Sequence, residues 1–321
     1  MAGAMRLFQH DEFPNIVAAT AAAWSLDEAF VEKDYYITEI LRIVAGRYQP
    51  GQMIFKGGTS LSKAWGLIER LSEDVDLLLV AERFEPRLGR RRIDTELAAL
   101  TEAIATHPGL ELDGGQSERV AGRARSDWFA FVPRFERIGI APSIMTEPGV
   151  RGGTSPTDER EISSVVGRFL RDSGQGEIAE DLSPFPMTVL HFRRTFVEKL
   201  FVVHSLVERL VSEGRPLGRD ARHYIDLYAL AGEDEVQTML RSPEYQAIKE
   251  DYERVSLKFF KKAYRRPPAL SFAGSVGVFP AAEVRAQIAI DYDEQCRTLC
   301  YGTYPSFDEV IGRFEEIRDV L

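Results

Sequence analysis

Cysteine, long apolar runs and an excess of positive charge are all scarce in this sequence of 321 residues. The two cysteines, Cys296 and Cys300, are too few for a disulfide framework, and no histidine stands near them in the sequence to complete a zinc site. We interpret them as two small apolar side chains of the core. The cysteine content is typical of a reducing compartment, so we expect a cytoplasmic protein.

The apolar runs, such as 77–81 and 200–203, are far too short to cross a bilayer. The first residues, MAGAMRLFQHDEF, contain no apolar stretch of the kind that marks a secretory signal. Asp and Glu number 50 against 40 Lys and Arg, which gives a formal net charge of −10. This balance argues against indiscriminate binding to nucleic acid. It leaves room for a local basic groove, because the field at a site depends on how charges are arranged.

Hydrophobic periodicity predicts two parts of different character. In the first part, helices are expected at 11–24, 27–45, about 60–70 and 93–107, and strands at 53–55, 75–80, 127–135 and 138–147. The segments 148–160 and 173–187 are loops by composition. Beyond about residue 188 the pattern is helical, with helices expected at 192–212, 219–232, 234–249, 250–263, 281–298 and 306–321. The sequence therefore predicts an α/β (α+β) fold, with a mixed sheet and flanking helices in 1–185 and a helical domain in 186–321.

The segment Phe55–Val80, FKGGTSLSKAWGLIERLSEDVDLLLV, carries the clearest chemical signal. Gly57 and Gly58 allow the backbone to approach a phosphate closely. The hydroxyls of Thr59 and Ser60, together with the N–H groups at the start of a helix, favour an anion. The turn is not a P-loop, because no Gly-Lys-Ser/Thr follows at the required spacing.

Asp74 and Asp76 open the next predicted strand. At positions i and i+2 of a strand their carboxylates share one face, about 6–7 Å apart. Carboxylates placed in this way suit Mg²⁺, or Mn²⁺ in its place, together with the phosphates of a substrate. A D-x-D or a GGT alone is usually solvated charge or an ordinary turn. Their combination, in this order and on these elements, favours a phosphate-transfer site.

At these residues the sequence resembles the AbiEii-type nucleotidyltransferase toxins of abortive-infection and type IV toxin–antitoxin systems, which belong to the DNA polymerase β-like nucleotidyltransferase superfamily. The resemblance covers most of the chain. It is carried by Val31–Tyr36, Phe55–Lys63, Arg70–Leu77, Glu198–Leu200 and Arg222–Tyr228.

The resemblance implies that the Gly-Gly-Thr turn binds an NTP, that Asp74 and Asp76 bind metal, and that Lys199 and Asp226 line the same cleft as catalytic residues. Lys199 would neutralise triphosphate charge, and Asp226 would act as a base or orient a partner. From the residues alone, an ordinary helix-surface lysine and a structural salt-bridge aspartate are the favoured interpretation, and the resemblance reverses this. The nucleotide-binding set is expected to consist of Gly57, Gly58, Thr59, Ser60, Lys63 and Ser72.

A third metal ligand is expected from an adjacent strand, as is common in this superfamily. Glu147, followed by Arg151 in a glycine-rich loop, resembles the family's strand that ends in a glutamate. Pro142 inside the predicted strand departs from that pattern, since proline suits an edge or a bulge.

The resemblance also implies transfer of NMP to RNA, and to tRNA in particular, with a block of translation and a cognate antitoxin. The segment 258–266, KFFKKAYRR, offers five cations and three aromatic residues for such a partner. A buried aromatic helix face with solvated lysines explains the segment equally well. Further arginines that could form a positive rim stand at positions 83, 87, 90, 91, 92, 119, 123 and 125.

Other functions remain open from the sequence. The acceptor could instead be a small molecule or a protein side chain, and the chain could also be an NTP-binding regulator without catalysis or an RNA-binding interaction protein. A separate hypothesis concerns Ser72, which stands two residues before Asp74. A phosphate on Ser72 would add about −1.5 to −2 charge beside the predicted metal ligands and disable the site.

Overall fold

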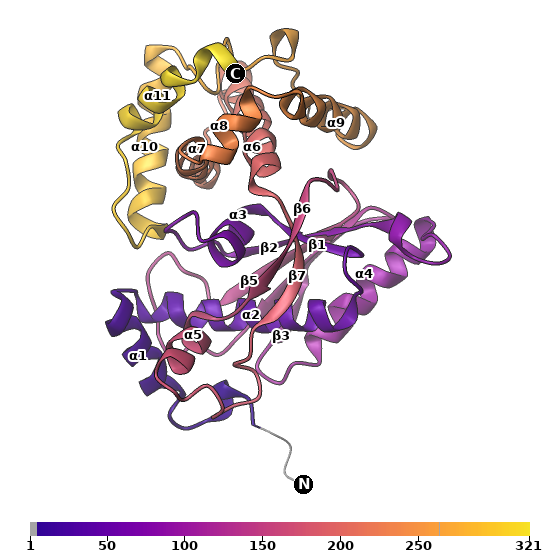
Figure 1. The fold of residues 1–321 in the computed structure, drawn as a ribbon, viewed down its shortest axis with the longest axis vertical. Helices are drawn as coiled ribbons and strands as arrows, with labels where there is room; N and C mark the ends of the chain where they lie inside the picture. Colours follow the sequence, from indigo (N-terminus) through magenta and orange to yellow (C-terminus); the bar gives the residue numbers. More distant parts are fainter. Residues whose placement is uncertain (1–4, 263) are drawn as a thin grey trace. The chain divides into compact units, whose positions relative to one another are not determined.

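The computed structural model describes residues 5–262 and 264–321, and Figure 1 shows the order of its helices and strands. The described chain divides into two compact units. The first contains the described residues up to Trp65 together with Leu71–Val189, and the second contains Gly66–Arg70 and Leu190–Leu321. None of the described helices is long and apolar enough to cross a membrane.

In the described residues, the first unit is built around a seven-stranded sheet in the order β3-β4-β5-β2-β1-β7-β6. The central strand β2 pairs antiparallel with β1 and parallel with β5, while β1 also pairs in parallel with β7. This mixed sheet confirms the predicted fold class. The strands are β1 (Met53–Lys56), β2 (Asp74–Leu79), β3 (Glu111–Val120), β4 (Ala124–Ala130), β5 (Ser143–Gly149), β6 (Thr157–Ile162) and β7 (Phe185–Leu190).

The helices of this unit are α1 (Phe13–Trp24), α2 (Glu28–Arg47), α4 (Arg90–Ala105) and α5 (Val165–Asp172), with α1, α2 and α5 grouped together in Figure 1. Asp27 caps α2 by accepting a hydrogen bond from the N–H of Ala29. Apolar residues of α2 at helical spacing join β1 and β2 residues in one core. The helices predicted at 11–24, 27–45 and 93–107 are therefore confirmed within a few residues.

Several local predictions for this unit were wrong. The segments 148–160 and 173–187, expected to be loops, contain most of β6 and part of β7, and β3 was not expected. β3 and β6 are mostly exposed strands at the two edges of the sheet, so they lack the apolar alternation that identifies a strand. The helix expected at 60–70 consists only of α3 (Gly57–Ser60) and a π-helical turn, η2 (Leu61–Trp65), and it ends before Gly66, whose φ is +66°.

The strands expected at 127–135 and 138–147 are displaced along the chain. β4 ends at Ala130, and β5 begins at Ser143. Pro142 therefore precedes β5 instead of interrupting it, and its carbonyl accepts a hydrogen bond from the N–H of Phe131 at 3.0 Å. Because Pro142 lies before β5, the strand that ends near Glu147 contains no proline at position 142. The departure from the family pattern that was expected there does not occur.

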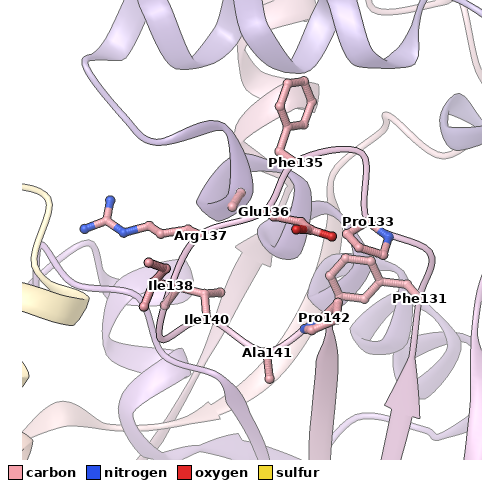
Figure 2. A pocket seen from close by; sticks show the side chains of 10 residues that line it. Phe131, Pro133, Phe135, Glu136, Arg137, Ile138, Ile140, Ala141 and Pro142 are labelled. Carbon is pink, nitrogen blue, oxygen red and sulfur yellow. The ribbon is translucent and has the colours of Figure 1, made fainter.

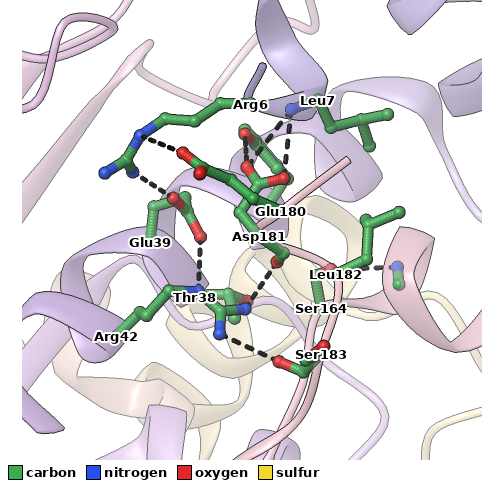
Figure 3. A network of polar contacts seen from close by, with 12 residues as sticks. Arg6, Leu7, Thr38, Glu39, Arg42, Ser164, Glu180, Asp181, Leu182 and Ser183 are labelled. Carbon is green, nitrogen blue, oxygen red and sulfur yellow. Dashed lines mark hydrogen bonds and ion pairs between the residues drawn. The ribbon is translucent and has the colours of Figure 1, made fainter. Parts of the chain in front are cut away.

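A polar network fastens the start of the chain to α2 and to the segment 180–183 (Figure 3). Asp181 accepts hydrogen bonds from the N–H of Leu7 and from the hydroxyl of Tyr35. Arg42 donates to the carbonyls of Asp181 and Ser183 at 2.5 and 2.9 Å. Through these bonds one face of α2 is held to segments remote from it in sequence.

The second unit is helical in the described residues. Its helices are α6 (Phe192–Glu213), α7 (His223–Ala231), α8 (Asp234–Leu240), α9 (Pro243–Phe259), α10 (Ala282–Leu299) and α11 (Phe307–Glu316), with short 3-10 turns at Gly218–Arg222, Pro268–Leu270 and Arg318–Val320. The division expected at 249/250 was wrong, because Ser242 caps α9 and Pro243 occupies its first turn. The helix expected over 250–263 ends at Phe259, and Ala263 lies outside the described residues.

The short segment Gly66–Arg70 joins the second unit through main-chain contacts. Arg70 forms an isolated antiparallel bridge with Cys300, and the N–H of Tyr301 donates to the carbonyl of Glu69 at 3.1 Å. A Cβ on Gly302 would lie only 1.9 Å from Oε2 of Glu69. A side chain at position 302 would therefore require the carboxylate of Glu69 to move.

Candidate functional site

The glycine turn and Asp76 lie against each other in the first unit. Lys56, the last residue of β1, pairs with Asp76 in the antiparallel register, and Gly57 follows with φ of +78°. A Cβ on Gly57 would lie 2.0 Å from Oδ2 of Asp76. Glycine is required here twice, by the left-handed backbone and by the nearby carboxylate.

The hydroxyls of the turn are used within the protein. Thr59 donates from Oγ1 to the carbonyl of Asp74, and Ser60 donates from Oγ to the carbonyl of Gly57 at 2.8 Å. A hydroxyl has a single proton to donate, so neither one is directed at a ligand in this arrangement. The bond from Thr59 instead ties the turn to the start of β2.

Asp74 and Asp76 share one face of β2. Both are half-buried, and they alternate with the buried Val75 and Leu77, as the i, i+2 spacing requires. In the parallel register between β2 and β5, Asp76 lies opposite Glu147. Three carboxylates therefore occupy neighbouring positions on two adjacent strands.

Electrostatic crowding is evident at Glu147. Partial desolvation of its carboxyl group, followed by repulsion from Asp76 and Asp74, raises the pKa of Glu147 to about 7, against the opposing effect of Lys56. Burial and the neighbouring Arg123 lower the pKa of Arg151, whereas the charge of Glu147 acts to raise it. Positive side chains thus border the same end of β5.

The donor set fits a hard divalent cation. Carboxylate oxygens are the ligands that Mg²⁺ prefers, and the absence of a Cβ at Gly57 lets the carboxylate of Asp76 lie against the glycine turn. Among the described residues, no group of three or more His, Cys, Asp or Glu side chains is already arranged to hold a metal ion. Glu147 instead accepts a long hydrogen bond of 3.4 Å from Oγ of Ser126, so a third ligand from this position requires rotation of its side chain.

Lys63 and Ser72 are less accessible than the sequence suggested. The Nζ atom of Lys63 lies 2.5 Å from Oδ1 of Asp34, and burial lowers the pKa of Lys63 while Asp34 raises it. Ser72 is only 7% exposed. Their assignment to the nucleotide site stays a prediction.

Lys199 and Asp226 meet in the second unit. The Nζ atom of Lys199, on α6, lies 2.7 Å from Oδ2 of Asp226, on α7, and 3.1 Å from Nδ1 of His223. Arg70 donates to both oxygens of the same carboxylate at 2.7 Å. Burial alone would raise the pKa of Asp226, but Arg70 and Lys199 outweigh it and hold this pKa well below its usual range.

No role was predicted for Arg70 from the sequence. The available signal was its place as the first residue of the family motif Arg70–Leu77. The predicted catalytic roles of Lys199 and Asp226 stay predictions. What the structure shows is a buried cluster in which each charge has a partner.

A separate hollow in the first unit was not predicted (Figure 2). It has a volume of about 430 Å³, and most of the residues that line it are of apolar type. Its lining comes from Ala29 and the segment 131–142, including Phe131, Pro133 and Phe135. None of the predicted site residues lines it.

Comparison with known proteins identifies the family. The model of the family described as nucleotidyl transferase AbiEii toxin, type IV toxin–antitoxin system, matches residues 44–313. This chain belongs to the AbiEii family. The match covers most of the chain and confirms both the resemblance and the assignment as a nucleotidyltransferase of a toxin–antitoxin system. None of the curated proteins matches the chain.

Solved structures support the fold of this AbiEii protein. MenT4, a nucleotidyltransferase toxin from Mycobacterium tuberculosis H37Rv, is similar with a TM-score of 0.52 and 17% identity, over 95% of this chain and 96% of MenT4. A structure described as a putative nucleotidyltransferase from H. pylori matches with a TM-score of 0.39 and 15% identity, over 85% of this chain and 98% of its own.

Proposed function

We propose that this AbiEii nucleotidyltransferase uses Mg²⁺, or Mn²⁺, to transfer NMP from an NTP to the 3′-terminal hydroxyl of an RNA, tRNA in particular, and thereby blocks translation and growth. The observation that carries the proposal is the contact between the Gly57 turn and Asp76, with Glu147 opposite on the next strand. This arrangement places hard oxygen ligands beside a backbone that can approach a phosphate closely.

In this proposal Asp74 and Asp76 hold the metal, and Glu147 adds a third carboxylate. The metal would neutralise charge on the triphosphate and on the departing pyrophosphate. The main chain of Gly57 and Gly58 approaches the phosphates, while Thr59 keeps the turn attached to β2. The acceptor oxygen forms the new bond to the α-phosphorus as the bond to pyrophosphate breaks, and the acceptor proton leaves to solvent.

The proposal also assigns a role to a cluster of charged side chains in the helical unit. Lys199 and Arg70 together exceed the single charge of Asp226, so the buried cluster carries a net positive charge when His223 is neutral. We assign Asp226 the task of orienting these two cations. A base role is less suitable, because a carboxylate whose pKa is held low accepts a proton poorly at neutral pH.

Two surfaces support an RNA acceptor. Lys258, in the last turn of α9, and Lys261 and Lys262, beyond its end, are exposed, and Phe260 is 36% exposed. The ring of Tyr264 lies 6.1 Å from that of Phe201, so it packs against the core and is not a free stacking platform. Tyr264 therefore fits the alternative of a buried aromatic face. The lysines and Phe260 fit a surface that binds nucleic acid.

The predicted arginine rim is partly neutralised by acidic neighbours. Arg119 lies 2.9 Å from Asp94, and Arg125 lies 2.5 Å from Asp127. Arg123 and Arg151 together give a positive patch near Glu147, which suits the phosphates of an NTP or of an RNA end. The type IV family also leads us to propose a cognate antitoxin as partner and the cytoplasm as the place of action.

The test is transfer of label from each of the four α-³²P NTPs into purified tRNA, total protein and an aminoglycoside, with Mg²⁺ and with EDTA. We expect label in tRNA only, dependent on Mg²⁺ or Mn²⁺, and lost in Asp74→Asn and Asp76→Asn. Asp158→Asn, at a side chain that is 50% exposed on β6, is the matched control and should retain transfer.

Other outcomes identify the alternatives. Label in protein or aminoglycoside contradicts the RNA acceptor and supports transfer to a side chain or a small molecule. NTP binding without transfer to any pool supports a regulator without catalysis. Growth inhibition that persists in Asp74→Ala supports an RNA-binding interaction protein.

A further inference from the structure

Three consecutive charged residues on α2, Glu32, Lys33 and Asp34, project into the first unit. Glu32 and Lys33 are 0% and 1% exposed, and the side chain of Asp34 is 15% exposed. Consecutive residues of a helix point about 100° apart, so three neighbours reach three different segments. Charged side chains are almost never buried without a partner, and each of these has one.

Lys33 connects the starts of two parallel strands. Its Nζ atom donates to Oε1 of Glu73 and to the carbonyl of Ala141, both at 2.8 Å. Glu73 immediately precedes β2, which carries Asp74 and Asp76. Ala141 lies two residues before β5, which carries Glu147.

Asp34 connects the far end of the glycine turn to α5. Its Oδ1 atom accepts from Nζ of Lys63 at 2.5 Å, and its Oδ2 atom accepts from the N–H of Val165 at 2.8 Å. Lys63 stands in the π-helical turn that follows Gly57–Ser60. One carboxylate therefore ties the segment that follows the glycine turn to the start of α5.

Glu32 completes the set by holding the segment that joins β4 to β5. Its carboxylate accepts from the N–H of Arg134 at 3.0 Å and from that of Phe135 at 3.1 Å. This segment forms most of the wall of the hollow in Figure 2. The three side chains thus fix the segments that lead into or out of every element of the candidate site.

We propose that Lys33 and Asp34 are positioning residues for nucleotidyl transfer. Lys33 sets the distance between the metal-binding carboxylates of β2 and those of β5. Asp34 sets the position of the glycine turn relative to these carboxylates. The inference rests on the proposed function, since it takes Asp74, Asp76, Glu147 and the turn as the site.

The chemistry of the pair between Lys33 and Glu73 supports a role in geometry. A buried ion pair gains little stability over an apolar pair of the same volume, because both charges lose their hydration. The pair does fix direction and distance more narrowly than apolar contacts do. A site that must bring carboxylates on separate strands to one cation benefits from that restriction.

The two residues should have separable kinetic effects. Loss of the Lys33 link should lower kcat about 10²-fold, the size expected for a displacement of about 1 Å, and raise the Mg²⁺ concentration for half-maximal rate. Asp34→Asn keeps an acceptor for Val165 but weakens the hold on Lys63. It should raise KM for the NTP about 10-fold with a smaller change in kcat, because the turn contacts the nucleotide.

The decisive variant is Lys33→Met combined with Glu73→Gln, because removing both charges avoids an unpaired charge that would unfold the protein. The full chain is assayed for label transfer into the acceptor pool found above, over a range of Mg²⁺ concentrations. Amide hydrogen exchange is measured at 74–77 and 143–147. Arg47→Met with Glu96→Gln is the control, a more exposed ion pair between α2 and α4 with the same N–O distance of 2.8 Å.

We expect the Lys33/Glu73 variant to keep a Tm near that of the parent, to lose kcat, to need more Mg²⁺ and to exchange faster at both strand starts. The control should change none of these. A Lys33/Glu73 variant with parental kcat, Mg²⁺ requirement and exchange overturns the inference, provided that Asp76→Asn is inactive. If Asp76→Asn transfers label at the parental rate, the proposed site itself is wrong and the inference falls with it.

Discussion

Arg70 holds Asp226 through two parallel contacts of 2.7 Å, from Nε to Oδ1 and from Nη2 to Oδ2. Both side chains are almost completely buried, and they are 156 residues apart in the sequence. Arg70 stands only four residues before Asp74 in the sequence. The pairing makes Asp226 important for the fold whatever its part in catalysis.

Asp226→Asn should destabilise the helical unit strongly. It leaves Arg70 and Lys199 buried without their shared carboxylate, and breaking a buried ion pair in this way costs about 3–5 kcal/mol. The free energy of unfolding in urea measures the effect. Asp293→Asn, which removes one partner of an exposed pair on α10, should cost only about 0–1 kcal/mol. Equal effects of the two substitutions would contradict the structural role of Asp226.

Two buried histidines should make stability depend on pH. Burial lowers the pKa of His204 and His223, and Lys199 lowers that of His223 further. The unfolded chain therefore binds more protons than the folded chain just below pH 6.5, and the free energy of unfolding falls as the pH is lowered through that range.

The contribution of His223 is measured by comparing the parent with His223→Gln between pH 7.5 and 5.5. Glu147, whose pKa is raised to about 7, contributes with the opposite sign in both proteins, so the difference isolates the histidine. The parent should lose up to about 1.4 kcal/mol per pH unit more than the variant below pH 6.5. Parallel pH profiles would show that His223 is not neutral in the folded state.

Gly57→Ala should slow nucleotidyl transfer about 10²-fold. The added Cβ would lie 2.0 Å from Oδ2 of Asp76, so the carboxylate must move, and a displacement of about 1 Å costs about 10²-fold in rate. Gly66→Ala is the matched control, because its φ is +66° and no atom lies within 4 Å of the new Cβ. Transfer rates and Tm of both variants separate displacement of Asp76 from backbone strain, and a Gly57→Ala protein with the activity of Gly66→Ala would contradict the site.

A negative charge at Ser72 should disable the site. Ser72 is 7% exposed and stands two residues before Asp74, so Ser72→Glu adds like charge close to the proposed metal ligands. Ser72→Gln has the same size without the charge, and comparing label transfer by the two variants isolates the electrostatic effect. We expect Ser72→Glu to lose at least about 10-fold in rate relative to Ser72→Gln, a cost of about 1.4 kcal/mol. Equal rates would reject the hypothesis that a phosphate at Ser72 switches the protein off.

The sequence predicted the elements whose pattern is local. The helix now seen as α2 was recognisable because its apolar residues recur with helical spacing, and the strand β2 because it is an apolar run bounded by charges. Asp74 and Asp76 could be placed on one face because two successive residues of a strand point to opposite sides. β3 and β6 were missed because edge strands exposed to solvent carry no such pattern.

The amino-acid sequence by itself determined the fold class, the family motifs and the glycine turn before an acidic strand, since each depends on the spacing of nearby residues. Only the tertiary structure decided which charges meet. Lys33 pairs with Glu73 across 40 positions and Arg70 with Asp226 across 156, and neither pairing has a local signature. Partner choice depends on how helices and strands pack, because burial is what forces each charge to find one specific counterpart.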